Sequence, residues 1–445
     1  MVSENQLQSP VIGKKLSSVV PAKNRGENEV HELTEMDLAM KLHYIRGLYF
    51  FERNAVQGVS VKDLKDALFP LLDNYFTTAG RIRRSETGRP MTKCNDAGVR
   101  TVEAYCEKTI DEWLATKGGS CFSDGLCYNQ VLGPDLYFSP LVFLQQFTWF
   151  KCGGLAVGLS WAHILGDPFS ASIFINTWGE IMADRFPQMS IRYVSKSQKS
   201  KLLNSLIVKK PFSMKQIDPV GDHWLIANYC KMETRSFQIT GKDLDRLIST
   251  ICYGNQTTRA SHFDILTAII WKSLYRIREN LGPTRVTICT SNKDAHKREK
   301  EIPNNGMMFS TVEADFLKGV EIDVLELAIM ISEKRVDENE RIEEMAGREN
   351  GKLDFIVYGA NLTFVNLEEA DIYEVEMKGK KPVFANYSIE GIGDEGVVLV
   401  LQGPKYGEEE GCCGRTITMV LPQHELSLIE NELGTYWSSI GQDAM

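Results

Sequence analysis

The sequence lacks an apolar run long enough to cross a membrane. A membrane-spanning helix needs about 20 consecutive apolar residues, and charged or polar residues interrupt every apolar run of this 445-residue chain before that length. Residues 1–15 also lack the apolar core of a signal peptide. We therefore expect no transmembrane segment and residence on the cytosolic side, with the cytoplasm and the nucleus both open.

An excess of basic charge is also missing. The 50 lysines and arginines are outnumbered by 59 aspartates and glutamates, which gives a formal net charge of −9. No basic stripe is available to release counterions from a phosphate backbone. This charge balance argues against nucleic acid as a partner.

Paired cysteines are absent as well. The ten cysteines include no Cys-x-x-Cys pair, a pattern typical of reduced thiols in a reducing compartment. Cys412 and Cys413 are adjacent but have no histidine nearby at ligand spacing, which argues against a zinc site. We expect no metal and no permanently bound cofactor.

One glycine-rich motif lacks the element that would give it a function. Residues 391–396, Gly-Ile-Gly-Asp-Glu-Gly, match the dinucleotide-binding pattern G-x-G-x-x-G. In that fold a helix follows the motif, and the helix N-terminus holds the pyrophosphate. Here the β-branched run Val397–Leu401 follows and predicts a strand. We therefore interpret the glycines as a hairpin turn.

The most informative stretch that is present is Lys151–Ser172. Its apolar part, Cys152–Trp161, predicts a buried strand. Asp167 and Pro168 are typical of a helix start, with Asp at the N-cap and Pro in the first turn. His163 then lies at the exit of a buried strand, where a neutral imidazole can act as a base. The motif His-x-x-x-Asp alone leaves a second interpretation open, in which His163 is a buried turn histidine and Asp167 only a cap.

The remaining sequence mixes expected strands and helices in two halves. A chain of 445 residues is too long for one ordinary core. Residues 187–219 are polar, basic and without sustained periodicity, and we interpret them as a crossover. The domains we predict are residues 1–190 and 222–445, joined by a crossover loop over 191–221, and the fold class is α/β with mixed sheets. The predicted strands are Leu16–Pro21, Leu48–Phe51, Pro140–Phe150, Cys230–Ile239, Arg285–Thr290 and Phe355–Val365, and the predicted helices run from Thr34 to about Arg46, from Ser60, over Gly241–Ile251, from Ser261 and over Glu321–Val336.

Several segments along the chain occur together in an order known from one protein family. They are Ala79–Arg81 with Cys94-Asn95, Phe150–Gly154 leading to His163-x-x-x-Asp167, Ser261–Lys272, Tyr358–Val365 and Thr416–Leu433. In combination these segments are specific. From about Leu16 to Leu433 the chain resembles the plant BAHD acyltransferase family.

The resemblance implies a fold and a chemistry. It implies two chloramphenicol-acetyltransferase-like domains with an interdomain channel, in which acyl-CoA reaches His163 from one face and an acceptor reaches it from the other. His163 would be the general base that deprotonates the acceptor hydroxyl or amine, which then attacks the thioester. Asp167 would be structural, turned from the channel to pair with an arginine. Thr363 and Phe364 would line the channel, and acyl-CoA would be a substrate or ligand rather than a resident cofactor.

The sequence departs from the family pattern at several motifs. Asp371–Val375 stands where the family has Asp-Phe-Gly-Trp-Gly, and only the aspartate is kept. Phe364 stands where the family usually has Trp, and Pro168 replaces the glycine that commonly follows the motif Asp. Asn292–His296 replaces an arginine-containing segment, so we expect Asp167 to lack its usual salt-bridge partner.

Four nearly continuous runs narrow the resemblance further. They are Met36–Tyr44, Val131–Asp135, Leu159–Asp167 and Tyr358–Asn366. They are similar to the Eceriferum/Glossy clade of the family, which implies a role in cuticular wax formation by promoting elongation of very-long-chain acyl-CoAs. The implied partner is a ketoacyl-CoA synthase of the endoplasmic reticulum, with which a chain that is otherwise a monomer would associate, and this role would not need the histidine motif. The alternative is an active acyl-CoA-dependent O- or N-acyltransferase with His163 as its general base.

Overall fold

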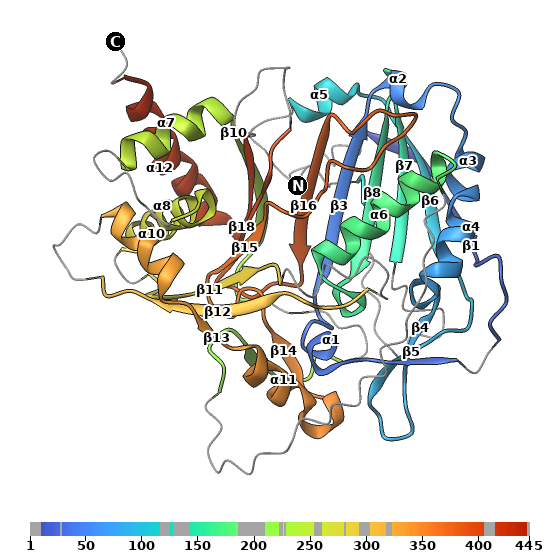
Figure 1. Cartoon of the computed structure of the whole chain (residues 1–445), viewed down its shortest axis with the longest axis horizontal. Helices are drawn as coiled ribbons and strands as arrows, with labels where there is room; N and C mark the ends of the chain where they lie inside the picture. The colour runs from blue at the N-terminus through green and yellow to red at the C-terminus, as the bar shows by residue number, and fades with distance from the viewer. Residues whose placement is uncertain are drawn as a thin grey trace, which may run out of the picture.

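Two large β-sheets with helices on their faces form the computed structural model of the chain (Figure 1). Within the described residues, one sheet has six strands and the other has seven. Each sheet mixes parallel and antiparallel pairs, which confirms the predicted α/β class with mixed sheets. The structure describes residues 10–26, 29–115, 125–127, 143–185, 210–221, 226, 228–252, 260–279, 282–292, 303–316, 323–404 and 414–442.

The six-stranded sheet combines strands from distant parts of the chain. Its order is β1-β6-β7-β8-β3-β16. The strands are β1 (Val11–Val19), β3 (Tyr44–Phe51), β6 (Val99–Cys106), β7 (Phe143–Phe150), β8 (Leu155–Ala162) and β16 (Phe384–Glu390). Strand β16 pairs antiparallel with β3 along its whole length. Every residue of β3 and β8 is buried, because both strands lie inside the sheet and both faces are covered.

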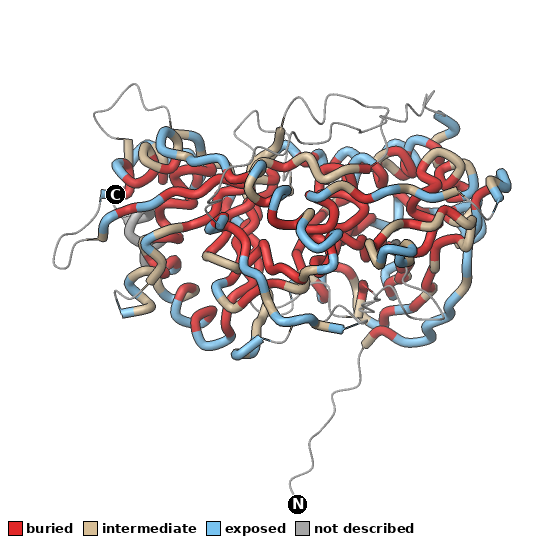
Figure 2. Tube along the Cα trace, turned by 90° about the horizontal axis from the view of Figure 1, so that it is seen from below, coloured by how far each residue is buried: buried red, intermediate tan, exposed pale blue. Residues whose placement is uncertain are grey.

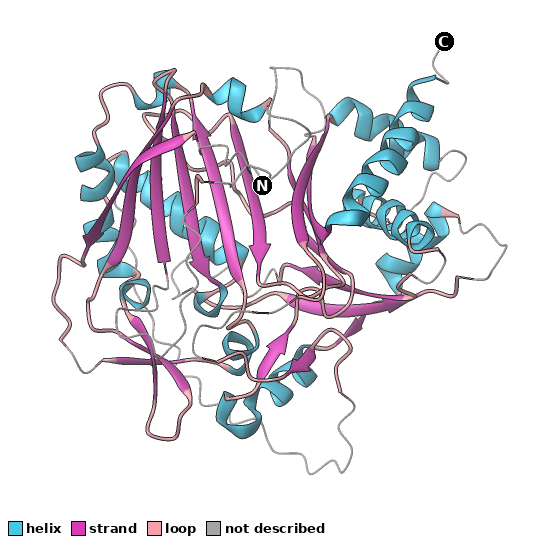
Figure 3. Ribbon diagram, turned by 180° about the vertical axis from the view of Figure 1, so that it is seen from behind, coloured by secondary structure: helices cyan, strands magenta, loops and turns pink. Residues whose placement is uncertain are grey.

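The seven-stranded sheet comes from the second half of the chain, in the order β10-β18-β17-β15-β11-β12-β13. The strands are β10 (Met232–Ile239), β11 (Arg285–Thr290), β12 (Met308–Glu313), β13 (Val336–Asp337), β15 (Thr363–Leu367), β17 (Val397–Gln402) and β18 (Arg415–Pro422). Its face turned away from the first sheet is covered by helices (Figure 3). These helices are α7 (Gly241–Ile251), α8 (His262–Ile277), α10 (Val324–Glu333) and α12 (Gln423–Gln442).

The largest hydrophobic core joins the two sheets. It contains Tyr49 and Tyr387 of the first sheet together with Val365 and Leu399 of the second. Helix α6 (Pro168–Met182) packs its apolar side into the same core. Figure 2 shows the buried segments running through the middle of both halves. The smaller elements are α1 (Glu35–Ala39), α2 (Arg53–Val56), α3 (Val61–Asp66), α4 (Leu68–Asn74), α5 (Ile110–Leu114), α11 (Asn339–Gly347), β2 (Val30–Glu32), β4 (Arg81–Arg84), β5 (Pro90–Lys93), β9 (Lys215–Ile217) and β14 (Asp354–Ile356).

The predicted helix from Thr34 to about Arg46 is wrong beyond its start. Thr34 does begin a helix, through a capping box with Asp37, but α1 ends at Ala39. From Tyr44 the chain is strand β3, because this stretch pairs with β8 on one side and β16 on the other. Pairing on both sides overrides the local helical pattern.

The predicted strand Phe355–Val365 is two strands with a turn between them. Strand β14 ends at Ile356, and β15 begins at Thr363. In the turn, Gly359 has a φ of 80° and its backbone packs directly on that of Gly393, since an added Cβ would lie 2.5 Å from the Gly393 oxygen. The strand predicted after the glycines of 391–396 is confirmed as β17, but the hairpin is not, because β16 and β17 belong to different sheets.

Two further predictions concern the crossover and the absence of a membrane-spanning helix. Most of the predicted crossover, residues 187–209, lies outside the described residues, and the described part contains β9. Where the structure describes the chain, it contains no helix with the length and apolarity needed to span a bilayer.

Candidate active site

His163 lies at the corner between β8 and α6, as the sequence predicts. Strand β8 ends at Ala162, a single 3₁₀ turn begins with His163, and α6 starts at Pro168. The His163 N–H donates to the His43 carbonyl oxygen at 3.0 Å, next to the pairing of β8 with β3. The residue is buried, with an exposed fraction of 1%. The corner therefore holds the imidazole inside the protein.

Asp167 is the N-cap of α6, which confirms the predicted helix start. Its Oδ1 accepts the Ser170 N–H at 3.0 Å. Its Oδ2 accepts the Gly306 N–H at 2.9 Å, from a segment far along the chain. Both oxygens thus receive backbone donors, and Asp167 links the start of α6 to the segment before β12. In Asn292–His296, which replaces the family's arginine-containing segment, residues 293–296 lie outside the described residues, so the missing salt-bridge partner of Asp167 stays a prediction.

Both ring nitrogens of His163 contact side chains of the protein. Nδ1 lies 2.9 Å from Asn305 Oδ1, and Nε2 lies 3.0 Å from the Tyr358 hydroxyl oxygen. The Asn305 amide nitrogen donates to Asp37 Oδ1 and to the His163 carbonyl oxygen, both at 2.9 Å. These two partners can only accept, so the amide orientation is fixed and its oxygen faces Nδ1. The proton on the ring is therefore on Nδ1.

Burial sets the protonation state of this cluster. It lowers the pKa of His163 to about 4, against the smaller opposing effects of hydrogen bonds that include Asn305. It also raises the pKa of Tyr358 well above its usual value, so the phenol keeps its proton. A neutral imidazole with its proton on Nδ1 has one lone pair, on Nε2. That lone pair accepts the Tyr358 O–H.

Neighbouring residues hold Tyr358 in place. The Val357 N–H donates to His43 Nε2 at 3.1 Å. The Tyr358 ring meets the ring of His43 edge-on at 5.0 Å and that of Phe309 at 5.9 Å. Burial lowers the pKa of His43 to about 3, so this ring is also neutral. Tyr358 is thus packed between two neutral histidines and a phenylalanine.

The remaining candidate residues are Thr363 and Phe364, and the structure does not place both of them next to His163. Thr363 is buried; its hydroxyl accepts the Gly359 N–H at 3.2 Å and donates to the Asn361 oxygen at 2.8 Å, so it supports the turn that carries Tyr358. Phe364, the next residue of β15, belongs to the core beneath the covering helices. Successive residues of a strand face opposite sides of its sheet. The lining role expected for these two residues stays a prediction.

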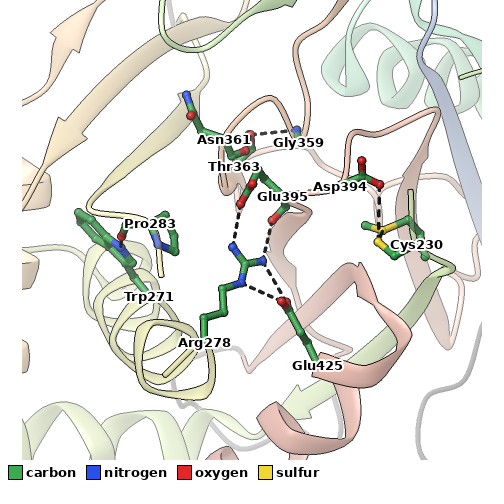
Figure 4. A network of polar contacts seen from close by, with 11 residues as sticks. Cys230, Trp271, Arg278, Pro283, Gly359, Asn361, Thr363, Asp394, Glu395 and Glu425 are labelled. Carbon is green, nitrogen blue, oxygen red and sulfur yellow. Dashed lines mark hydrogen bonds and ion pairs between the residues drawn. The ribbon is translucent and has the colours of Figure 1, made fainter. Parts of the chain in front are cut away.

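Neither of two described cavities has His163 in its lining. One, of about 530 Å³, contains Arg278, which donates to Glu425 and Glu395 at 2.8 Å (Figure 4). Its lining holds more carboxylates than guanidinium groups, which does not suit a phosphate. The other, of about 790 Å³, includes Cys152 before β8, whereas His163 follows β8, a strand of about 26 Å. The expected channel at His163 stays a prediction, and the described residues contain no cluster of His, Cys, Asp or Glu suited to a metal.

The fold and the corner motif agree with a match along nearly the whole chain. Residues 10–435 match a model described as the transferase family. The chain belongs to this family, the BAHD transferases. The solved structure of F. graminearum TRI101 complexed with coenzyme A and deoxynivalenol has the same fold, with a TM-score of 0.70, 14% sequence identity, and coverage of 92% of this chain and 98% of that one.

Full-length relatives within the BAHD family confirm the narrower resemblance to the Eceriferum clade. ECERIFERUM 2 of Arabidopsis thaliana is 41% identical over 437 residues, which are 96% of this chain and 98% of that protein. ECERIFERUM 26-like of Arabidopsis thaliana is 40% identical over 424 residues, 95% of each chain. The similarity therefore extends over both sheets and all the segments that form the site.

Sequence reasoning missed most of the partners of His163. Tyr358 and His43 stand inside two of the clade-like runs, Tyr358–Asn366 and Met36–Tyr44, but the motifs of the family assign neither to the site. Their membership in those runs was the available signal. Asn305 had none, because Pro-Asn-Asn-Gly reads only as a turn. Another of the four clade-like runs, Val131–Asp135, lies outside the described residues.

Proposed function

We propose that this BAHD chain promotes the elongation of very-long-chain acyl-CoAs for cuticular wax, together with a ketoacyl-CoA synthase. The observation that carries the proposal is that His163 is buried and that its Nε2 lone pair already accepts the Tyr358 hydroxyl. A general base must reach the proton that it removes. We therefore propose that the chain acts by binding and not by catalysis. The full-length similarity to ECERIFERUM proteins supports this role.

The proposal includes a location and a ligand. The chain would associate with the endoplasmic reticulum through the synthase and would otherwise be a monomer of two domains, over residues 1–190 and 222–445. Acyl-CoA would be its ligand, because TRI101, which shares the fold, is a coenzyme A complex. In this role the protein supports the partner's chemistry and carries out none of its own.

Acyl transfer from CoA to an alcohol or amine is the second candidate. The retained corner of His163 and Asp167 favours it, since Asp167 orders the strand exit that carries the histidine. In that reaction the acceptor hydroxyl loses its proton to Nε2 and attacks the thioester carbonyl, and the CoA thiolate leaves. The reaction requires the Tyr358 hydroxyl to leave Nε2 first.

Co-expression separates the two candidates. The chain and a ketoacyl-CoA synthase are produced together in yeast, and acyl chain lengths are measured for wild type and His163→Ala. We expect His163→Ala to retain the longer products, because a binding role does not use the Nε2 lone pair. His424→Ala, at an exposed position on α12, is the matched control. If the acyl chains made with folded His163→Ala are not longer than those made by the synthase alone, the proposal fails and acyl transfer becomes the better account.

A further inference from the structure

A directed chain of hydrogen bonds runs through the site. The Asn305 amide nitrogen donates to Asp37 Oδ1, and His163 Nδ1–H donates to Asn305 Oδ1. The Tyr358 O–H then donates to His163 Nε2. Each donor in this sequence points toward the carboxylate, as in sites where a base is oriented by a third group and faces a hydroxyl. The imidazole is thus prepared as a base, and the hydroxyl that faces it belongs to the protein.

The Tyr358 hydroxyl has the geometry of an acceptor substrate. Its oxygen lies 3.0 Å from Nε2, within the range over which a general base removes a proton. Another hydroxyl cannot use the same lone pair while the phenol holds it. The only other described contact of this hydroxyl is a long one, 3.9 Å to the Met307 sulfur.

The segment that carries Tyr358 is anchored on both sides. Before it, Lys41 donates to the Leu353 carbonyl oxygen and pairs with Asp354, both at 2.7 Å. This ion pair is nearly inaccessible to solvent. After it, Gly359 packs against the backbone of Gly393. The phenol is therefore held against the base by a fixed stretch of backbone.

We propose that Tyr358 occupies the position at His163 Nε2 where an acceptor hydroxyl would bind, and thereby inhibits a latent acyl-CoA hydrolase activity. With the phenol removed, a water molecule donates to Nε2 and its oxygen bonds to the thioester carbonyl carbon, while its proton passes to Nε2. The carbon–sulfur bond then breaks, and the CoA sulfur takes the proton from the imidazole. The products are a free carboxylic acid and CoA, and His163 is neutral again.

The test measures CoA release from palmitoyl-CoA by the full-length protein. Free CoA is quantified by chromatography, because a thiol reagent would also react with the exposed Cys152. We expect Tyr358→Phe to release CoA at least about tenfold faster than wild type, since general base catalysis contributes 10²–10⁴-fold. Adding His163→Ala should return the rate to that of wild type. Tyr387→Phe, which loses a buried phenol bonded to Tyr49 at 2.5 Å, is the matched control and should not gain activity.

Thermal unfolding establishes that each variant is folded, and Tyr358→Leu carries the same expectation if Tyr358→Phe does not fold. A folded variant without the phenol that stays at the wild-type rate overturns the inference. CoA release by wild type that disappears in His163→Ala also overturns it, because His163 would then be open already. The proposed elongation function is judged separately, by the product lengths of the co-expression experiment.

Discussion

At the scale of single residues, the position of one proton decides what His163 can do. The oxygen of Asn305 accepts a hydrogen bond from Nδ1–H, because its amide nitrogen donates to Asp37 and to the His163 carbonyl oxygen. The remaining lone pair is on Nε2, where Tyr358 supplies the donor. The residues that orient the imidazole therefore also occupy both of its ring nitrogens. A retained motif histidine is compatible with a protein that binds acyl-CoA without reacting with it.

The same residues predict how stability depends on pH. Burial lowers the pKa of His163 to about 4 and that of His43 to about 3, from 6.5 in the unfolded chain. As pH falls below about 6.5, the unfolded chain takes up protons that the folded chain does not, so stability is full above this pH and is lost below it. Each histidine should contribute a loss of about 1 kcal/mol between about pH 6.5 and 5.5.

Urea unfolding at about pH 7 and about pH 5.5 checks this expectation, with wild type compared to His163→Asn. The comparison reports the contribution of His163 together with its effect on His43, whose pKa it helps to lower. Wild type should lose about 1.2 kcal/mol more than the variant. Equal losses in the two proteins would show that folding does not lower the pKa of His163.

At the scale of elements, one carboxylate connects a helix to a distant loop. Asp167 caps α6 and also accepts the Gly306 N–H from the segment that carries Asn305. The Asp167 N–H donates in turn to the Asn304 carbonyl oxygen at 3.1 Å. Because Asn305 orients His163, the cap of α6 and the orientation of the base depend on the same three-residue stretch.

Replacing Asp167 should therefore cost more than the loss of an ordinary cap. Asp167→Ala leaves both the Ser170 N–H and the Gly306 N–H without their acceptor, and we expect it to lower the free energy of unfolding by about 2–4 kcal/mol. Asp167→Asn keeps one acceptor oxygen and should cost about half as much. Chemical denaturation of both variants measures the difference. Full stability in Asp167→Ala combined with a lost chemical step would instead make Asp167 a catalytic residue.

The elements that sequence reasoning recovers are those with local causes. The start of α6 is readable because the Asp167 side chain bonds to a backbone group three residues away. The helix predicted through Arg46 fails because β8 and β16, far apart in the sequence, both pair with this stretch. The environment of His163 is likewise distant, with Asn305 and Tyr358 separated from it by 142 and 195 residues. No local pattern encodes which residues meet across such separations.

At the scale of the whole molecule, the two halves share structure instead of standing apart. Strand β16, near residue 387, completes the sheet that begins with β1, while β17 directly after it enters the other sheet. The largest core draws side chains from both sheets. The first sheet therefore depends on residues of the second half for its edge and for its packing.

A split of the chain at residue 221 tests this dependence. Residues 1–221 alone leave β3 as an unpaired apolar edge, which favours aggregation. We expect this fragment to be found in the pellet when it is produced alone, and to be recovered as a 1:1 complex by gel filtration when residues 222–445 are produced with it. Monodisperse, folded 1–221 would show that the first half is complete without β16.

The late arrival of β16 also sets an order of events during synthesis. A ribosome makes the chain from its N-terminus, so β3 and β8 emerge when more than 200 residues are still untranslated. The second partner strand of β3, β16, begins more than 200 residues after β8 ends, and domains usually fold as soon as their residues are available. Until β16 emerges, the nascent chain exposes an apolar strand whose every side chain is buried in the finished protein. This protein should therefore depend on chaperones that hold nascent chains, and slowing translation between the two halves should lower its yield instead of raising it.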